Sequence, residues 1–458
     1  MEKTVHIVGA GLAGSEAALQ LAARGHRVVL HEMRPLVSTE VHKTDGCAEL
    51  VCSNSLKGTR EDSAPGMLKR ELEALGSRLY GFALQHAVPA GGALAVDREL
   101  FSQAVTSSIE NEERITLVRS EVHGLAELGE DAAAVVLATG PLTSAALSRC
   151  LEELTGSGHL AFYDAAAPIV MADSLDYGKV FRQSRYEDSA EQSLGDYLNA
   201  PFTKEEYERF IDELLGAERV VARDFESREL FQACQPIEEI ARAGRDAPRF
   251  GPLKPVGLTD PATGRRPWAA LQLRAENAQA TSYNLVGFQT NLKFAEQERV
   301  FRMIPGLEHA EFARFGVMHR NTFVDAPRLL DRTLRLTHAT APLPVPVYVA
   351  GQLGGTEGYC EAIRSGLHAA VSVSAHVHGI EPPELPVETA FGALLAYATD
   401  PDVRDYQPMH VNFGILPPLD PPIRNKRERY RAYAQRGAAA LERYASALRN
   451  CGLAEGAF

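Results

Sequence analysis

The chain has 458 residues, 45% of them hydrophobic and 23% charged, which is typical of a globular protein long enough for two or three domains. Its formal net charge of -13 argues against a protein that coats nucleic acid indiscriminately, and its six cysteines are too sparse for a disulfide framework and include no CxxC pair that would suggest a metal site. No apolar run reaches the roughly 18 residues of a membrane helix, and the few residues before the first strand leave no room for a signal peptide, so a cytoplasmic protein is predicted.

The chain opens with the pattern of a βαβ unit. Residue patterns predict a buried strand at 4–8, a helix at 13–24 and a second strand at 27–32. Two parallel strands joined through a helix commit this part of the chain to an α/β sheet.

The middle of the chain has a different composition. A further strand is predicted at 132–138, but from about 201 to 305 acidic helical segments alternate with loops rich in Gly and Pro. A strand at 345–350 and a helix at 363–377 then resume the first pattern. We therefore predict a Rossmann-like domain made of residues 1–200 and 311–458, with a smaller α/β domain inserted at 201–310.

The C-terminal segment is basic and amphipathic. After a proline-rich linker at 417–422, Tyr430, Tyr433, Leu441, Tyr444 and Leu448 follow helical spacing. Gly437 on the same face costs a helix about 1 kcal/mol relative to Ala, so one interrupted helix and two shorter helices are both open. Eight Arg and Lys residues against two Glu give this segment a local charge of +6.

A dinucleotide fingerprint lies between the first strand and the first helix. Its residues are Gly9, Ala10, Gly11, Leu12, Ala13 and Gly14. The glycines permit a tight turn, close approach of a pyrophosphate and close helix–strand packing, while the helix N-terminus supplies N–H groups for the phosphates. Glu32 ends the second strand, where its carboxylate can accept hydrogen bonds from both ribose hydroxyls.

Two further glycine sites favour FAD over NAD as the bound dinucleotide. Gly140 follows the strand at 132–138, and a later turn opens another helix with Gly351, Gly354, Gly355, Thr356 and Gly358. FAD is long enough to need backbone contacts at both its ends, and a helix N-terminus near the flavin stabilises the anionic reduced ring. The alternative is that Gly354 and Gly355 form only a turn. No second GxGxxG is present, so NAD(P)H is expected to bind transiently.

Several segments together identify a family. Residues 32–35 (Glu-Met-Arg-Pro), 48–56 (Ala-Glu-Leu-Val-Cys-Ser-Asn-Ser-Leu), 319–322 (His-Arg-Asn-Thr) and the 351–359 turn closely resemble the folate- and FAD-dependent tRNA (uracil-5-)-methyltransferases, the TrmFO family, which is related to the GidA flavoproteins. The resemblance covers essentially the whole chain. It implies formation of 5-methyluridine in the T-loop of tRNA, with a methylene group from 5,10-methylenetetrahydrofolate and electrons from NAD(P)H through FAD as carrier and reductant.

The resemblance also implies the site residues. Carbon C5 of uracil becomes nucleophilic when a thiolate adds to C6, and we assign this attack to Cys234, with Cys52 acting near the flavin. Either cysteine can instead be a small buried side chain. His319 is expected to stack on the pterin of the folate, Arg320 to bind its glutamate carboxylates and Asn321 to hydrogen-bond the pterin.

The expected partner is a tRNA whose target base leaves its stack. Two basic segments are candidates for phosphate contacts: residues 424–449, and an inserted-domain set comprising Arg242, Arg245, Arg249, Lys254, Arg265 and Arg266. A solvated charged face is the alternative for both. Other activities that stay open are a GidA-type enzyme, for which the chain is too short, an NAD(P)H-dependent flavin oxidoreductase without RNA, an RNA-binding flavoprotein without chemistry, and the same reaction on ribosomal RNA. The oligomeric state is left open, a monomer included.

Overall fold

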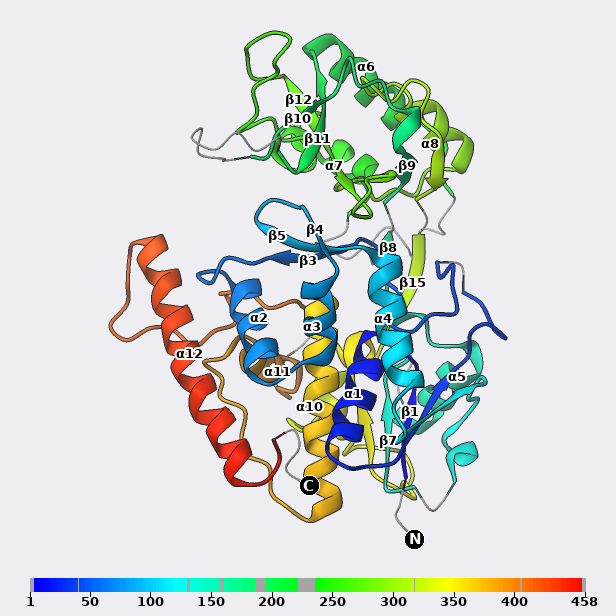
Figure 1. Cartoon of the computed structure of the whole chain (residues 1–458), viewed down its shortest axis with the longest axis vertical. Helices are drawn as coiled ribbons and strands as arrows, with labels where there is room; N and C mark the ends of the chain where they lie inside the picture. Colours follow the sequence, from blue (N-terminus) through cyan, green and yellow to red (C-terminus); the bar gives the residue numbers. More distant parts are fainter. Residues whose placement is uncertain are drawn as a thin grey trace.

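The computed structural model describes residues 4–39, 41–129, 132–156, 160–165, 167–185, 195–220, 235–316, 318–403 and 406–454. They form a large domain around a parallel sheet and a smaller domain around an antiparallel sheet, which lies beyond one end of the large domain (Figure 1). No helix in these ranges is both long enough and apolar enough to cross a bilayer.

The large domain is built on a five-stranded parallel sheet. Its strands, in spatial order, are β16 (Val347–Val349), β7 (Ala134–Leu137), β1 (Val5–Val8), β2 (Val28–Glu32) and β6 (Ile115–Arg119). Central β1 pairs with β2 on one side and β7 on the other, so the strand order reverses at the carboxyl end of β1. This is the place where doubly wound sheets bind dinucleotides, and the predicted Rossmann-like fold is confirmed.

The helices of the large domain pack against its parallel sheet and against one another. The helices of the large domain are α1 (Leu12–Ala23), α2 (Ala64–Ala74), α3 (Arg78–Gln85), α4 (Arg98–Glu110), α5 (Ala145–Thr155), α9 (Ala326–Leu329), α10 (Tyr359–His378), α11 (Ala390–Ala398) and α12 (Lys426–Asn450). Helices α1 and α10 lie side by side, and a Cβ on Gly366 of α10 would overlap the carbonyl of Ala13 in α1. The first residues of α10, from Tyr359 to Ala362, line part of the cavity described below. The close contact between the two helices therefore positions this part of the cavity wall next to α1.

Helix α12 is a single continuous helix that packs outside α2 (Figure 1). Gly437 lies on its buried face, where a Cβ would come within 2.6 Å of Met67 Cε and 2.9 Å of the carbonyl oxygen of Glu388. The glycine therefore allows close packing and does not interrupt the helix.

The smaller domain has a six-stranded antiparallel sheet with its own apolar core. Its strands, in spatial order, are β10 (Phe181–Arg182), β11 (Tyr197–Phe202), β12 (Ala269–Ala275), β13 (Ser282–Leu285), β9 (Ile169–Met171) and β14 (Phe312–Arg314), and its helices are α6 (Lys204–Gly216), α7 (Ile237–Ala243) and α8 (Phe294–Phe301). The sheet thus takes strands from both sides of 201–310. The division into folding units at 200 and 310 stays a prediction, whereas the sheet itself extends from β9 to β14.

Two small sheets lie where the domains meet (Figure 1). One is the antiparallel ribbon of β8 (Leu160–Ala165) and β15 (Met318–Phe323), which leads into and out of the smaller domain. The other has the order β3 (Ser55–Gly58), β5 (Ala93–Val96) and β4 (Ala87–Val88). The segment just before β3 contains Cys52, so this cysteine is placed between the two domains.

Candidate functional site

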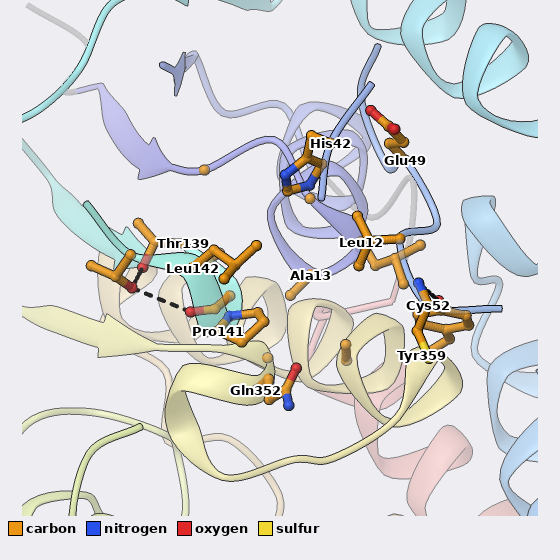
Figure 2. Close-up of a pocket in the computed structure, with 18 of the residues that line it drawn as sticks. Leu12, Ala13, His42, Glu49, Cys52, Thr139, Pro141, Leu142, Gln352 and Tyr359 are labelled. Atoms are coloured by element: carbon orange, nitrogen blue, oxygen red, sulfur yellow. Dashed lines mark hydrogen bonds between the residues drawn. The ribbon is translucent and has the colours of Figure 1, made fainter. Parts of the chain in front are cut away.

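A cavity of about 380 Å³ follows the carboxyl ends of β1, β2, β7 and β16, within the size range of ligand pockets. Its wall includes Gly9, Glu32, Cys52, Gly140 and Gly351. In Figure 2, Cys52 and Tyr359 lie together on one side of the pocket, and Thr139, Pro141 and Leu142 lie on the opposite side, with Leu12 and Ala13 between them. Three of the predicted glycine turns and one predicted cysteine therefore meet at one cavity.

The fingerprint turn leaves room for a phosphate. A Cβ on Gly14 would overlap the carbonyl oxygen of Gly9, so α1 can approach the turn only with glycine at 14. Gly11 is the N-cap of α1, no side chain caps the helix there, and a Cβ on Gly11 would meet no protein atom within 4 Å. The first turn of α1 is thus open to an anionic ligand at its partly positive end. Gly9, Gly11, Leu12 and Ala13 line the cavity.

The predicted glycine motifs contribute only some of their residues to the cavity wall. Gly351 and Gly358 lie on the cavity wall, as does the whole segment from Ala138 to Ser144. The predicted cofactor-binding residues that do not line the cavity are Ala10, Gly14, Gly354, Gly355 and Thr356. Gly355 lies against the hydroxyl of Tyr406, where a Cβ would overlap that oxygen, so this residue allows the turn to pack on Tyr406 and does not face the cavity.

Glu32 is buried at the end of β2 and already has several donors. Its Oε2 accepts the N–H of Ala10 at 2.9 Å, and its Oε1 accepts the N–H of Arg34 at 3.0 Å and Nε of Arg34 at 2.9 Å. Three of about four acceptor positions are used, which leaves about one for a ribose hydroxyl. Burial alone would raise the pKa of Glu32, but hydrogen bonds and charge from Arg34 outweigh it and the pKa is lowered. The carboxylate therefore stays ionised.

The segment around Cys52 is tied to α10. The N–H groups of Cys52 and Ser53 both donate to the hydroxyl oxygen of Tyr359, at 2.9 and 3.0 Å. Burial, and next the charge of Cys52, raise the pKa of Tyr359, so this phenol stays protonated. Cys52 is half-buried and lines the cavity.

Three arginines that the sequence did not single out hold the same segment. Arg98 donates to the carbonyl of Leu50 at 2.5 Å and to that of Cys52 at 3.4 Å. Arg314 donates to the carbonyls of Val51 and Cys52 at 2.8 and 3.0 Å. Arg274 bonds the side chains that follow Cys52. These arginines are spread over more than 200 residues and share no motif, so no sequence signal links them to Cys52.

His31 lines the cavity and was missed by sequence analysis. Its ring stacks on His6, with Nε2 of His31 3.0 Å from Nδ1 of His6. Burial, then the neighbouring His6, lower the pKa of His31 to about 4. A neutral imidazole thus faces the cavity at neutral pH. Its position next to Glu32 in the sequence is the one available hint.

The remaining predicted residues are less fully described. Cys234 lies outside the described residues. His319, Arg320 and Asn321 belong to β15, whose backbone lies against the turns at Gly140 and Gly351, although the positions of these three side chains are not described. Three residues after Cys234, the N–H of Ile237 donates to the carbonyl of Gln289 at 2.8 Å, and Gln289 lines the cavity.

Both predicted basic segments contain exposed cations. In α12 and just before it, Arg424, Lys426, Arg427, Arg431, Arg443 and Arg449 are exposed, and none is paired with a carboxylate in the described part of the chain. In the smaller domain, Arg242, Arg245 and Arg249 are paired with acidic residues. Arg265 and Arg266 are exposed and have no acidic partner among the described residues.

A family model and individual relatives both match most of this chain. The family model described as glucose inhibited division protein A matches residues 4–381. A protein of Geobacter sulfurreducens named methylenetetrahydrofolate–tRNA-(uracil-5-)-methyltransferase TrmFO is 53% identical over 444 residues, covering 97% of this chain and 99% of its own. The protein of the same name from Symbiobacterium thermophilum is 51% identical over 447 residues, which is 97% of both chains.

Among solved structures, GidA of Aquifex aeolicus has a similar fold. The TM-score is 0.69 at 17% identity, and the match covers 99% of this chain and 74% of GidA. At this identity the likeness concerns the fold alone.

Proposed function

Because the chain belongs to the glucose inhibited division protein A family, and within it to the TrmFO methyltransferases, we propose that it methylates C5 of a T-loop uridine in tRNA. The donor of the one-carbon unit is 5,10-methylenetetrahydrofolate, and NAD(P)H is the reductant. The observation that carries this proposal is the meeting of the dinucleotide fingerprint and Cys52 on one cavity. A tRNA substrate and these small-molecule co-substrates support a cytoplasmic protein.

The cavity fits FAD. The open N-terminus of α1 and the glycine turn before it would hold the pyrophosphate, Glu32 would accept a ribose hydroxyl, and the turn from Gly351 to Gly358 would border the flavin. When bound, FAD carries the one-carbon unit and supplies the electrons that reduce it to methyl.

Two cysteines have separate roles in the reaction at the uracil ring. Cys234 attacks C6, which makes C5 nucleophilic, and leaves again when the product forms. The described residue that supports a link between this segment and the cavity is Ile237, whose N–H donates to the carbonyl of the cavity residue Gln289. Cys52 acts from the wall that contains Tyr359, as a general acid or base or by protecting the reactive cofactor.

The folate binds next to the ribbon. Strand β15 runs beside the turns at Gly140 and Gly351, which supports a role for His319 in stacking on the pterin. Asn321 hydrogen-bonds the pterin, and Arg320 pairs with the glutamate carboxylates.

The tRNA lies across both domains. Exposed cations of α12 and the pair Arg265 and Arg266 bind phosphates and offset the energy needed to unstack the target base. Phe250, which is 82% exposed and directly follows Arg249 in the chain, offers a face for an unstacked base.

The test is a transfer assay with a labelled one-carbon unit. FAD-loaded protein is incubated with NADH, methylene-labelled methylenetetrahydrofolate and an unmodified tRNA transcript, and nucleosides are then analysed for labelled 5-methyluridine. Label at the T-loop position is expected, with none in a transcript whose target uridine is replaced by cytidine.

Controls separate the alternatives. Cys234→Ala is expected to abolish transfer while flavin reduction by NADH persists. Flavin reduction without any labelled nucleoside would contradict the proposal and favour a plain flavin oxidoreductase. A parallel ribosomal RNA transcript reports whether the same chemistry has another target.

A further inference from the structure

The loop before β3 is held by guanidinium groups from three separate segments. Arg98 at the start of α4 and Arg314 in β14 both donate to the carbonyl oxygen of Cys52. Arg274 in β12 donates to Oδ1 of Asn54 at 2.7 Å and to Oγ of Ser53 at 3.0 Å. Two of the three arginines belong to the smaller domain, so this domain reaches across the interface to fix the loop.

The charges around the loop do not cancel. Glu276, directly after β12, is paired with Arg98, and their side chains are only 7% and 15% exposed. Among the described residues, Arg98, Arg314 and the neutral phenol Tyr359 bond the backbone of Cys52, Arg274 bonds the two residues after it, and Glu276 pairs with Arg98. Within this described set, three cations against one carboxylate leave a surplus of positive charge around the segment that carries the thiol, an environment that favours the thiolate.

The interaction between Arg314 and Cys52 is mutual. Burial lowers the pKa of Arg314, and the charge of Arg98 lowers it further, whereas Glu276 and Cys52 raise it. A negative charge on Cys52 therefore stabilises the buried guanidinium, and the guanidinium stabilises that charge in return.

We propose that Arg98 and Arg314 are positioning residues for Cys52, which fix its peptide carbonyl and hold positive charge beside its thiol, so that the smaller domain controls the reactivity of this cysteine. Two arginines on one carbonyl would also serve a purely structural role. The two roles differ in one respect, because a structural clamp does not alter the ionisation of the thiol.

The test follows alkylation of Cys52 by iodoacetamide in the FAD-loaded protein across a range of pH, with tandem mass spectrometry to separate Cys52 from the buried Cys47. In Arg314→Gln we expect alkylation near pH 7 to be about tenfold slower, with a similar plateau rate at high pH, because the loss of one nearby cation reduces the thiolate fraction. The plateau of the alkylation rate at high pH measures how accessible the thiol is to iodoacetamide. The midpoint of the pH profile measures how strongly nearby charge favours the thiolate.

Two further variants complete the test. Arg314→Lys keeps the charge but not the two-carbonyl contact, so we expect it to restore the alkylation midpoint while methylation kcat stays below that of the wild type. Arg302→Gln is the matched control, since Arg302 also donates to a backbone carbonyl, that of Ala310, but within the smaller domain. It is expected to leave alkylation of Cys52 unchanged.

An unchanged alkylation midpoint in Arg314→Gln, with normal flavin content and melting temperature, would overturn the proposal. If Arg314→Gln does not fold, Arg98→Gln carries the same test from the other domain. The consequence for methylation rests on the proposed function, but the alkylation result does not. A protein that fails to methylate tRNA and still shows the shift would refute the function and retain the positioning role.

Discussion

Gly11→Ala separates cofactor binding from folding. Gly11 has φ -71° and ψ -168°, an extended conformation that alanine also adopts, and its Cβ would meet no protein atom within 4 Å. Ala is a poorer N-cap than Gly by up to about 1 kcal/mol, but it removes about 0.4–1 kcal/mol of unfolded-state entropy. The two effects nearly cancel, so the apoprotein should melt within a few degrees of the wild type.

FAD binding should respond differently. The added methyl group stands where a phosphate must approach the N–H groups of α1, and each charge-assisted hydrogen bond lost is equivalent to about 1.5–3 kcal/mol. The expected increase in Kd is roughly tenfold to a hundredfold. Titration of apoprotein with FAD, followed by quenching of flavin fluorescence, measures this change.

Gly81→Ala provides the matched control, because a Cβ on Gly81 in α3 also meets no atom within 4 Å but lies away from the cavity. It should leave the Kd for FAD unchanged. A Kd for Gly11→Ala within twofold of the wild type would refute the placement of the pyrophosphate at this turn. Gly14→Ala, by contrast, should lower the melting temperature of the apoprotein as well, since its Cβ overlaps Gly9.

Three further changes test other parts of the structure. Gly437→Ala should lower the melting temperature despite the roughly 1 kcal/mol gain in helix propensity, because the new Cβ meets the carbonyl of Glu388; a higher melting temperature would contradict this packing. Burial, then the charge of Arg364, lower the pKa of His368 to about 3, so its contribution to stability is complete above about pH 6.5 and falls by about 1.4 kcal/mol per unit below it. A pH series of melting temperatures for His368→Gln should lack that part of the acid loss, and a slope equal to the wild type's would be the contrary result. Replacing Arg265 and Arg266 together by Gln should reduce the slope of log affinity for tRNA against log salt by nearly 2, whereas an unchanged slope would remove this pair from the RNA surface.

The sequence predicted the features that depend on neighbouring residues. The β1–α1–β2 unit, its glycine fingerprint and the terminal Glu32 follow from apolar periodicity and turn chemistry within about 30 residues. The resumption of the sheet at β16 and α10 and the basic amphipathic α12 were predicted in the same way. Family-specific segments such as the one around Cys52 indicated the chemistry, because reactive groups must keep their chemical identity wherever the fold places them.

Other features were decided only by the tertiary structure. Gly437 looked like a possible break in α12, but its neighbour Met67 lies 370 residues earlier in the chain, and local propensity carries no information about such a contact. Glu32 was expected to accept two ribose hydroxyls, yet donors from Ala10 and Arg34 take up most of its acceptor positions. Such contacts arise when the chain packs.

The surroundings of Cys52 show the same division. The sequence identified the cysteine and the turn that precedes Tyr359, since both belong to recognisable segments. The convergence of Arg98 and Arg314 on its carbonyl depends on how two domains meet. Periodicity and propensity act over a few residues, whereas electrostatic and hydrogen-bond partners are chosen by proximity in space. The sequence therefore determined which chemical groups the chain carries and in what local order, and the tertiary structure decided which charges surround them.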